Sequence, residues 1–341
     1  MNKTFEIKVY NLDWTFNKLV SRSDLMKDFY YTSAINEWQG NADIELNLSI
    51  WNNDFTLWQV IKVYIFTDIY PNWKIIYSGM ITKMTWKITS WAESLTLNCI
   101  WLGSLLSFIY FKSWGNYAFT LNQEPATTLK AIIDYFNTKY TGTFLNYWAN
   151  VSNYGSSVNL SYSYSKCLDA LKNTASATNF WWNIRSTGEL YYKTTPTTAT
   201  HILTVWKDID TLTIENDSER VINEYILTYN SWTATNSDAT SKTSFWLREL
   251  QESKTDIQDL ASANIYGTNY ISKNKDYKKK TSIVINNSYN LESIEIGDTI
   301  SVVNTDLSLK NLQIRKISYN INNMVIELDE FDTLAKELIS N

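Results

Sequence analysis

Glycine and proline, the residues that most readily let a chain turn, are scarce in this sequence. Its 341 residues include only nine glycines and three prolines, whereas average glycine usage of roughly 7% would give about 24 glycines at this length. The same chain contains 15 tryptophans. Because glycine adopts positive φ angles without steric cost, a chain with many turns and few glycines must build those turns from other residues.

Many of the tryptophans stand between small or polar residues, where the sequence is typical of a turn. Examples are Trp14, Trp73, Trp91, Trp206 and Trp232. Two hypotheses account for them. Either they are a set of exposed aromatic side chains, or they occupy glycine positions because a stop codon has been reassigned. The many Asn, Ile, Lys and Tyr residues indicate an AT-rich genome, in which a tryptophan surplus is otherwise unexpected.

The length and charge of the chain limit its class. A chain of 341 residues is expected to form two or three domains. Its net charge of −5 and pI near 5.1 argue against specific nucleic-acid binding, which needs a basic surface. Residues 1–10 alternate like a strand, without the apolar core of a secretory signal. The apolar stretch at 100–111 is interrupted and too short to span a bilayer, so we expect no membrane-spanning segment.

The first segment, residues 1–112, is predicted to consist mainly of strands. Apolar residues alternate or cluster in short runs separated by turn residues, which is typical of an antiparallel barrel or sandwich. The runs are residues 1–10, 44–50, 60–66, 75–81 and 94–100. A short helix is predicted at 102–110. We assign this segment as a first antiparallel β-barrel domain.

The middle segment, residues 113–197, has a different pattern. Glu124 and Pro125 open a predicted helix, and apolar residues recur at helical spacing over 126–140. After a polar loop at 141–163, a second helix is predicted at 165–177 and a hairpin at 180–193. Two helices and a hairpin form a small α+β insertion domain.

The last segment, residues 198–341, returns to strand patterns and is predicted to form a second antiparallel β-barrel domain. Its strands are expected at 202–205, 212–215, 221–229, 281–285, 299–303, 312–320 and 325–329. A helix is expected near 256–270, an exposed loop tip at 233–243 and an amphipathic turn at 334–339. The fold class predicted for the whole chain is mainly β, with an α+β insertion between two barrels.

Cysteine and histidine are too few and too scattered to indicate a site. Cys99 and Cys167 lack the CxxC spacing of a zinc site or a disulfide framework, and Cys99 lies in an alternating run, as a small core residue would. His201 is the single histidine, so His-rich metal sites are excluded, a catalytic triad is not favoured, and a structural role is expected.

Acidic residues are the remaining candidates for catalytic groups. Asp208, Asp210 and Glu215 are close in sequence, but paired carboxylates must flank a cleft, and acids in a mixed strand and loop segment are usually solvated. Asp238 alone cannot form a calcium site. The chain has no glycine-rich phosphate loop, no GxSxG and no HExxH. We therefore predict no catalytic, cofactor-binding or metal-binding residue, no cofactor and no enzymatic activity.

Exposed aromatic rings could instead stack on sugars. The best candidate is the pair Trp181 and Trp182. Their side chains should point to opposite faces of a strand, so that one ring is in the core and the other is exposed.

Three stretches together resemble the hub protein at the tip of tailed-phage tails, that is, the N-terminal hub of the siphophage tail-associated protein and its relative in contractile-phage baseplates. The first stretch, 57–106, contains YSGMI followed by LTLNCIWLGSLL. The second comprises 168–193, with the hairpin NIRSTGELYYK, and then LTVWKD at 203–208. The third, 290–328, contains LESIEIGDTI and a strand with Ile-Ser-Tyr. The family pattern favours glycine where this chain has Trp58, Trp73, Trp101 and Trp206.

The resemblance implies a structural protein of the virion, assembled in the host cytoplasm. It implies a homotrimeric ring that caps the tail tube. The implied partners are the distal tail protein or tail-tube protein, the tape-measure protein, and tip or receptor-binding proteins, in host attachment and DNA ejection. A carbohydrate-binding surface module that uses exposed aromatics for host attachment is the alternative, and a cell-wall hydrolase is a third hypothesis.

Overall fold

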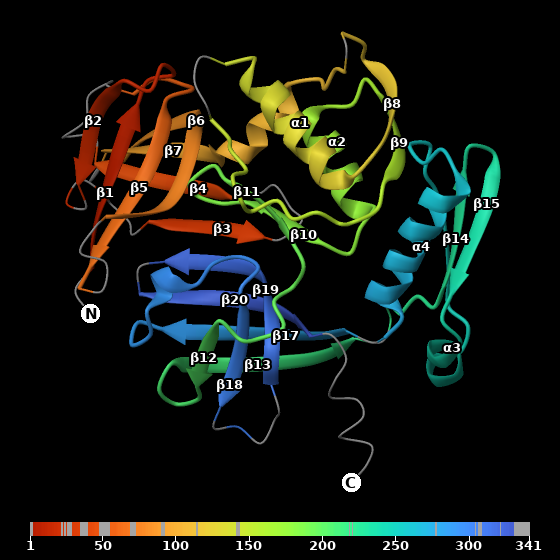
Figure 1. Ribbon diagram of the computed structural model, residues 1–341. Helices are drawn as coiled ribbons and strands as arrows, with labels where there is room; N and C mark the ends of the chain where they lie inside the picture. Colours follow the sequence, from red (N-terminus) through yellow and green to blue (C-terminus); the bar gives the residue numbers. More distant parts are fainter. Residues whose placement is uncertain are drawn as a thin grey trace.

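The structure is a computed structural model that describes residues 3–21, 23, 25, 29–34, 40–47, 55–68, 73–89, 93–113, 115–140, 144–217, 219, 221–276, 278–303, 305, 309–320 and 322–330. Strands predominate over helices in these residues (Figure 1). The prediction of a mainly β chain with helices in its middle segment is therefore confirmed. No helix of the described residues is long and apolar enough to cross a bilayer.

Strands occur along most of the described chain, whereas the α-helices lie between residues 125 and 274. The strands are β1 (Lys3–Tyr10), β2 (Phe16–Ser21), β3 (Tyr30–Ala34), β4 (Asn41–Asn47), β5 (Val60–Thr67), β6 (Lys74–Ile88), β7 (Glu93–Trp101), β8 (Ala118–Gln123), β9 (Val158–Ser163), β10 (Trp181–Ile184), β11 (Leu190–Lys193), β12 (His201–Thr204), β13 (Ile209–Asp217), β14 (Glu224–Tyr229), β15 (Trp232–Ser237), β16 (Glu249–Ser253), β17 (Lys278–Asn286), β18 (Thr299–Val303), β19 (Leu309–Asn320) and β20 (Asn323–Glu330). The helices are α1 (Pro125–Asn137), α2 (Cys167–Ser176), α3 (Ala239–Phe245) and α4 (Leu260–Asn274), with 3-10 helices η2 (Leu102–Phe108) and η3 (Leu291–Ser293).

One large sheet joins the two ends of the chain. Its strand order is β13-β17-β20-β19-β3-β4-β7-β6-β5-β1-β2, with β18 on β19 and β12 on β18. We call β1–β7 the N-terminal unit and β12, β13 and β17–β20 the C-terminal unit. The two units meet where β3 pairs antiparallel with β19, from Lys316 opposite Ala34 to Asn320 opposite Tyr30.

The predicted closure into two barrels is not confirmed. Within the described residues the pairing runs as one open path from β13 to β2. The 12-residue strand β19 explains the continuity, because its first part pairs with β18 and its last part pairs with β3. One strand thus serves both units.

Alternating burial explains why the predicted strands form. In β1 the side chains of Phe5, Ile7 and Val9 are buried while their neighbours are not. Strands with one buried face pack as a layer over a shared core. Residues of both units contribute to this first hydrophobic cluster, with Cys99 of β7 among them.

A second hydrophobic cluster is built around α1 and α2. Helix α1 begins at Pro125, and its N-terminal amide of Thr127 donates to the side chain of Glu124 at 3.1 Å. The predicted stripe, from Leu129 to Phe136, is buried. The hairpin β10–β11 is antiparallel as predicted.

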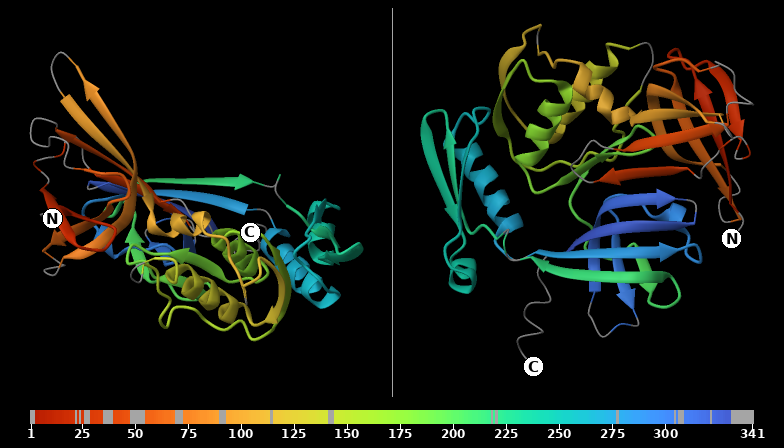
Figure 2. Two further views of the ribbon diagram at one scale, coloured as in Figure 1. Left: turned by 90° about the horizontal axis from the view of Figure 1, so that it is seen from above. Right: turned by 180° about the vertical axis from the view of Figure 1, so that it is seen from behind.

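The segment from β14 to α4 leaves the large sheet and packs on the middle segment. Ser262 Oγ of α4 accepts from the Asn159 amide at 2.9 Å, and Asn269 Nδ2 donates to the Ala177 carbonyl at 3.0 Å. In Figures 1 and 2 this segment, in cyan and teal, lies on the opposite side of the molecule from β1 and β2. The helix predicted near 256–270 is α4, which begins at Leu260.

Two local predictions are wrong. Residues 233–243 are not a loop tip, because they form most of β15 and the start of α3. The polar segment at 141–163 contains β9, which pairs with the unpredicted strand β8. Both polar strands form because a partner strand satisfies their backbone groups, which composition alone does not reveal. The amphipathic turn predicted at 334–339 lies outside the described residues.

Candidate functional site

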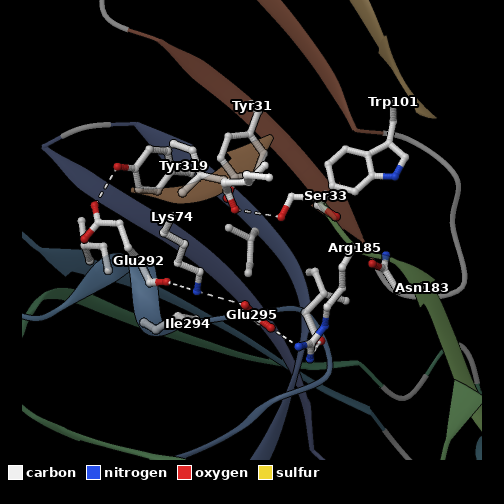
Figure 3. A pocket seen from close by; sticks show the side chains of 16 residues that line it. Tyr31, Ser33, Lys74, Trp101, Asn183, Arg185, Glu292, Ile294, Glu295 and Tyr319 are labelled. Atoms are coloured by element: carbon white, nitrogen blue, oxygen red, sulfur yellow. Dashed lines mark hydrogen bonds and ion pairs between the residues drawn. The ribbon is translucent and has the colours of Figure 1, made fainter. Parts of the chain in front are cut away.

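Three distant parts of the chain meet at a cluster of charged side chains, which we call the charged junction. Lys74 is the first residue of β6, Arg185 lies in the turn between β10 and β11, and Glu295 lies between η3 and β18. Lys74 Nζ is 3.0 Å from Glu295 Oε1, and Arg185 Nη1 pairs with Glu295 Oε2 (Figure 3). A single carboxylate therefore ties the middle segment to both units of the sheet.

Arg185 is held from several directions. Its guanidinium lies 3.7 Å from the centre of the Tyr191 ring, and Nη2 donates to the Ile296 carbonyl at 3.4 Å. Nη2 is also 3.9 Å from Asp298 Oδ1. A planar guanidinium suits this combination of stacking and ion pairing, so Lys would not replace it equivalently.

Gly297 explains how this turn approaches the hairpin. Its φ is +86°, and a Cβ at this position would lie 2.2 Å from the Trp181 ring. Only glycine fits a left-handed backbone against an aromatic face. The glycine of the LESIEIGDTI stretch therefore has a packing reason.

A buried ion pair lies behind the charged junction. Lys3 Nζ is 2.8 Å from Glu292 Oε1, and the two side chains are 3% and 0% exposed. Tyr319 donates its hydroxyl to the same oxygen at 2.7 Å. The pair connects the first described residue of β1 to η3, near the other end of the chain.

Hydrogen bonds to the main chain reinforce the contact between the hairpin and the N-terminal unit. Asn183 Nδ2 donates to the Ala34 carbonyl at 2.8 Å, and Ser186 Oγ donates to the Ile75 carbonyl at 3.0 Å. These bonds fix the hairpin against the ends of β3 and β6.

The charged junction borders a small pocket of about 50 Å³ that is partly open to solvent. Its lining combines apolar side chains, such as Ile76 and Ile317, with the charged groups described above. Each charged group drawn in Figure 3 already contacts another group of the same chain. The arrangement therefore joins segments of the chain.

Burial also keeps the phenols beside this cluster neutral. Desolvation raises the pKa of Tyr319, and the nearby Glu292 carboxylate raises it further. Desolvation likewise raises the pKa of Tyr31, with contributions from Glu295 and Glu292. Both phenols thus remain protonated over the physiological pH range.

His201 has structural contacts, as predicted. Its Nε2 is 3.1 Å from Asp298 Oδ2, and its Nδ1 is 3.1 Å from the Tyr289 hydroxyl. The tautomer determines which atom donates. In the described residues no three His, Cys, Asp or Glu side chains are grouped in a way that could hold a metal.

The two cysteines are buried in different hydrophobic clusters, Cys99 in the first and Cys167 in the second. Burial raises the pKa of the Cys99 thiol and raises that of Cys167 to about 12. Neither thiol is activated as a nucleophile.

Two of the three acids that were candidates for catalytic groups, Asp208 and Asp210, have structural contacts, and Glu215 is exposed as expected. Asp208 is buried, contrary to the expectation of a solvated acid, and its Oδ2 accepts from the Thr204 amide at 2.9 Å. Asp210 Oδ1 accepts from Asn286 Nδ2 at 2.9 Å. Asp238 is the N-cap of α3. A carboxylate that receives a main-chain amide orders a turn or a helix end.

The candidate sugar platform at Trp181 and Trp182 is not supported, because both side chains are buried. Opposite faces of β10 are both covered, one by the sheet core and the other by the second cluster. Alternation was correctly predicted for this strand, but the covering of its second face depends on tertiary contacts.

Sequence reasoning did not identify the charged junction. Glu295 and Arg185 are 110 residues apart, and Glu295 and Lys74 are 221 apart. The only local signals were the two turns that present these side chains, one at 185–188 and the other at 297–298.

No protein-family model and no curated protein matches this sequence. Solved structures do match its fold. A tail protein from Neisseria meningitidis MC58 is 11% identical, with a TM-score of 0.70 and 97% of each chain covered. The 43 kDa tail protein of prophage MuSo2 from Shewanella oneidensis is 11% identical, with a TM-score of 0.68 and coverage of 96% of this chain and 98% of that one.

A type VI secretion component of E. coli also matches, and it is described as similar to the T4 bacteriophage tail proteins gp27 and gp5. It is 10% identical, with a TM-score of 0.54 and coverage of 89% of this chain and 73% of that one. The chain therefore has the fold of the phage tail and baseplate hub proteins that its sequence resembles.

Proposed function

We propose that this protein is a structural hub of a phage tail tip or baseplate. In this proposal three copies form a ring that caps the tail tube and joins it to tip or receptor-binding proteins. The observation that carries the proposal is the fold match to phage tail proteins over nearly the full length of both chains. The role is mechanical, without an enzymatic step.

The domain division proposed for such a hub is 1–112, 113–197 and 198–341. The first part contains the N-terminal unit, and the last part contains the C-terminal unit together with the segment from β14 to α4. Three chains with two units each would supply six related positions around a tube. The continuous pairing through β3 and β19 supports this arrangement, because it sets one angle between the units in every copy.

The charged junction supports the same role. A ring closes only if each copy presents the same geometry to both neighbours. The shared carboxylate of Glu295 and the buried Lys3–Glu292 pair constrain the relative positions of the three parts. A cluster whose charged groups pair with one another within the chain suits a scaffold more than a ligand-binding protein.

The proposed partners are a distal tail or tail-tube protein on one side of the ring, and tip or receptor-binding proteins on the other. The tape-measure protein would end in the lumen. The proposed location is the virion tail tip, after assembly in the host cytoplasm. An acidic lumen would not retain DNA during ejection, which agrees with the net charge of −5.

The test is the mass and shape of the purified protein. Mass photometry and negative-stain imaging should show a trimeric ring, alone or after addition of the tail-tube or distal tail protein encoded with it. A stable monomer without affinity for either protein would contradict the proposal. The burial of Trp181 and Trp182 removes the best candidate pair for the carbohydrate-binding alternative. Specific retention of the protein on a glycan array would support that alternative.

A further inference from the structure

Tryptophan is over-represented among the residues with glycine-like backbone angles. In the described residues, nine residues other than glycine have a positive φ. Five of them are tryptophans, namely Trp14 (66°), Trp58 (71°), Trp148 (27°), Trp206 (71°) and Trp246 (61°). Four glycines have such angles. Tryptophan therefore occupies left-handed positions in this chain at least as often as glycine does.

The bulk of the aromatic ring does not explain this distribution. The chain also contains 23 tyrosines and 13 phenylalanines. Among those that the structure describes, only Tyr164 has a positive φ. Left-handed angles are unfavourable for all three aromatic residues for the same steric reason. The enrichment at positive φ is therefore specific to tryptophan and is not shared by tyrosine or phenylalanine.

The local geometry at these positions is the geometry of glycine. Trp246 terminates α3 with φ 61° and ψ 177°, a region that glycine alone commonly occupies. Glycine is also the usual residue at the end of a helix. Trp206 lies in the tight turn between β12 and β13, where the Asp208 amide donates to the Thr204 carbonyl at 2.9 Å.

Most of the side chains at these positions contribute little to the core. The exposed fractions are 91% for Trp206, 84% for Trp246 and 77% for Trp148. Trp58 is also exposed, and Trp14 is partly covered by Phe144 at a ring-centre distance of 5.0 Å. Packing therefore does not explain why a large ring stands at these turns.

Three other tryptophans are buried, as is usual for a large apolar side chain. Trp101 has φ −60° and is buried with its ring 5.5 Å from the Tyr77 ring, although the family pattern favours glycine there. Trp181 is buried and donates from Nε1 to the Thr194 carbonyl at 3.1 Å. Trp182 is buried in the second cluster. Among the described tryptophans, the backbone angle separates the five left-handed residues from the others. Burial alone does not, because Trp86 and Trp232 are exposed without a positive φ.

We propose that Trp14, Trp58, Trp148, Trp206 and Trp246 are glycines in the protein that its own cell makes. The codon at these positions is UGA, and that cell reads it as glycine. UGA differs from the tryptophan codon UGG in its third base and from the glycine codon GGA in its first. Trp101, Trp181 and Trp182 are encoded by UGG and are true tryptophans. This inference does not depend on the proposed function.

The gene provides the first test. UGA is expected at the five left-handed positions, and UGG at 101, 181 and 182. UGG at 206 and 246 would overturn the proposal.

Peptide mass spectrometry of protein from its own source provides the second test. Tryptic peptides 194–207 and 243–248 should each carry glycine in place of Trp206 and Trp246. Peptide 173–185 from the same digest is the internal control, and it should retain Trp181 and Trp182. Tryptophan in the first two peptides would overturn the proposal, and so would glycine in the control peptide.

Discussion

At the scale of single residues, the backbone angle separates residues that stabilise the fold from residues that strain it. A bulky side chain in a sparsely populated φ/ψ region costs about 1–3 kcal/mol. Five such positions would offset a large part of the net stability of about 5–15 kcal/mol typical of a folded protein. Glycine at the same positions removes this cost.

Replacing an exposed tryptophan of positive φ by glycine should therefore stabilise the protein that has tryptophan at these positions. We expect W206G and W246G each to raise the free energy of unfolding by about 1 kcal/mol, since relief of strain exceeds the added chain entropy of glycine. Urea unfolding followed by circular dichroism measures the change. The matched control W182G should lower the free energy of unfolding by about 3–5 kcal/mol, because it empties a buried site. Equal changes in the free energy of unfolding for W182G and W206G would contradict the distinction between buried and left-handed tryptophans.

At the scale of elements, short helices depend on their ends. Helix α3 has only seven residues, too few for independent stability. Its N-terminus is held by Asp238, whose Oδ1 accepts from the Ser241 amide at 2.8 Å, while Lys275 Nζ donates to Oδ2 at 3.1 Å. In the sequence Asp238 stands out only as an acid too isolated to bind calcium, because a cap becomes recognisable once the helix after it is recognised.

The cap should make α3 sensitive to acid. The hydrogen bond from the Ser241 amide, assisted by Lys275, lowers the pKa of the Asp238 carboxyl. Its stabilisation is therefore present above the unfolded pKa of about 3.9 and is lost as the pH falls through the lower folded value. We expect D238A to cost about 1 kcal/mol at pH 7 and to differ little from the original protein at a pH below the lowered folded pKa of Asp238.

Hydrogen exchange of the α3 amides at the two pH values measures this effect. D238N is the matched control, because Asn also caps helices but does not titrate. In D238N the α3 amides should remain protected from hydrogen exchange at both pH values. A pH-independent effect of D238A would show that the carboxylate charge is not responsible.

At the scale of the whole molecule, the buried Lys3–Glu292 pair joins β1 of the N-terminal unit to η3, which precedes β18 of the C-terminal unit. Removing one partner of a buried ion pair leaves an uncompensated charge and typically costs about 3–5 kcal/mol. We therefore expect K3M to destabilise the sheet strongly. The double variant K3M/E292Q should recover much of the loss, because the remaining side chain is neutral and can still accept from Tyr319.

The Cys99 thiol reports on this core, because it is buried in the hydrophobic cluster to which both units of the sheet contribute. In a C167S background, its labelling rate should rise in K3M and return toward the original in K3M/E292Q. If K3M alone left both labelling and the urea midpoint unchanged, the pair would not hold the units together.

Local patterns predicted most of the elements correctly, from the alternation of Phe5, Ile7 and Val9 to the helical stripe of α1. They did not predict β2, β3, β8, β9, β15 and β16, and the polar strands among these depend on their partners. Side-chain periodicity is a local property, so it specifies which face of an element is buried. Small and polar neighbours correctly indicated turns at Trp14 and Trp206, whereas Trp232 begins β15 and Trp91 lies outside the described residues.

Only the tertiary structure decided that β3 pairs with β19, that Trp181 and Trp182 are both covered, and that Glu295 meets Lys74 and Arg185. These contacts join residues far apart in sequence, and several partners would satisfy the same local pattern. The sequence by itself thus determined the faces, the turns and the excess of tryptophan. The choice among distant partners, and the backbone angles that divide the tryptophans into two populations, required the folded chain.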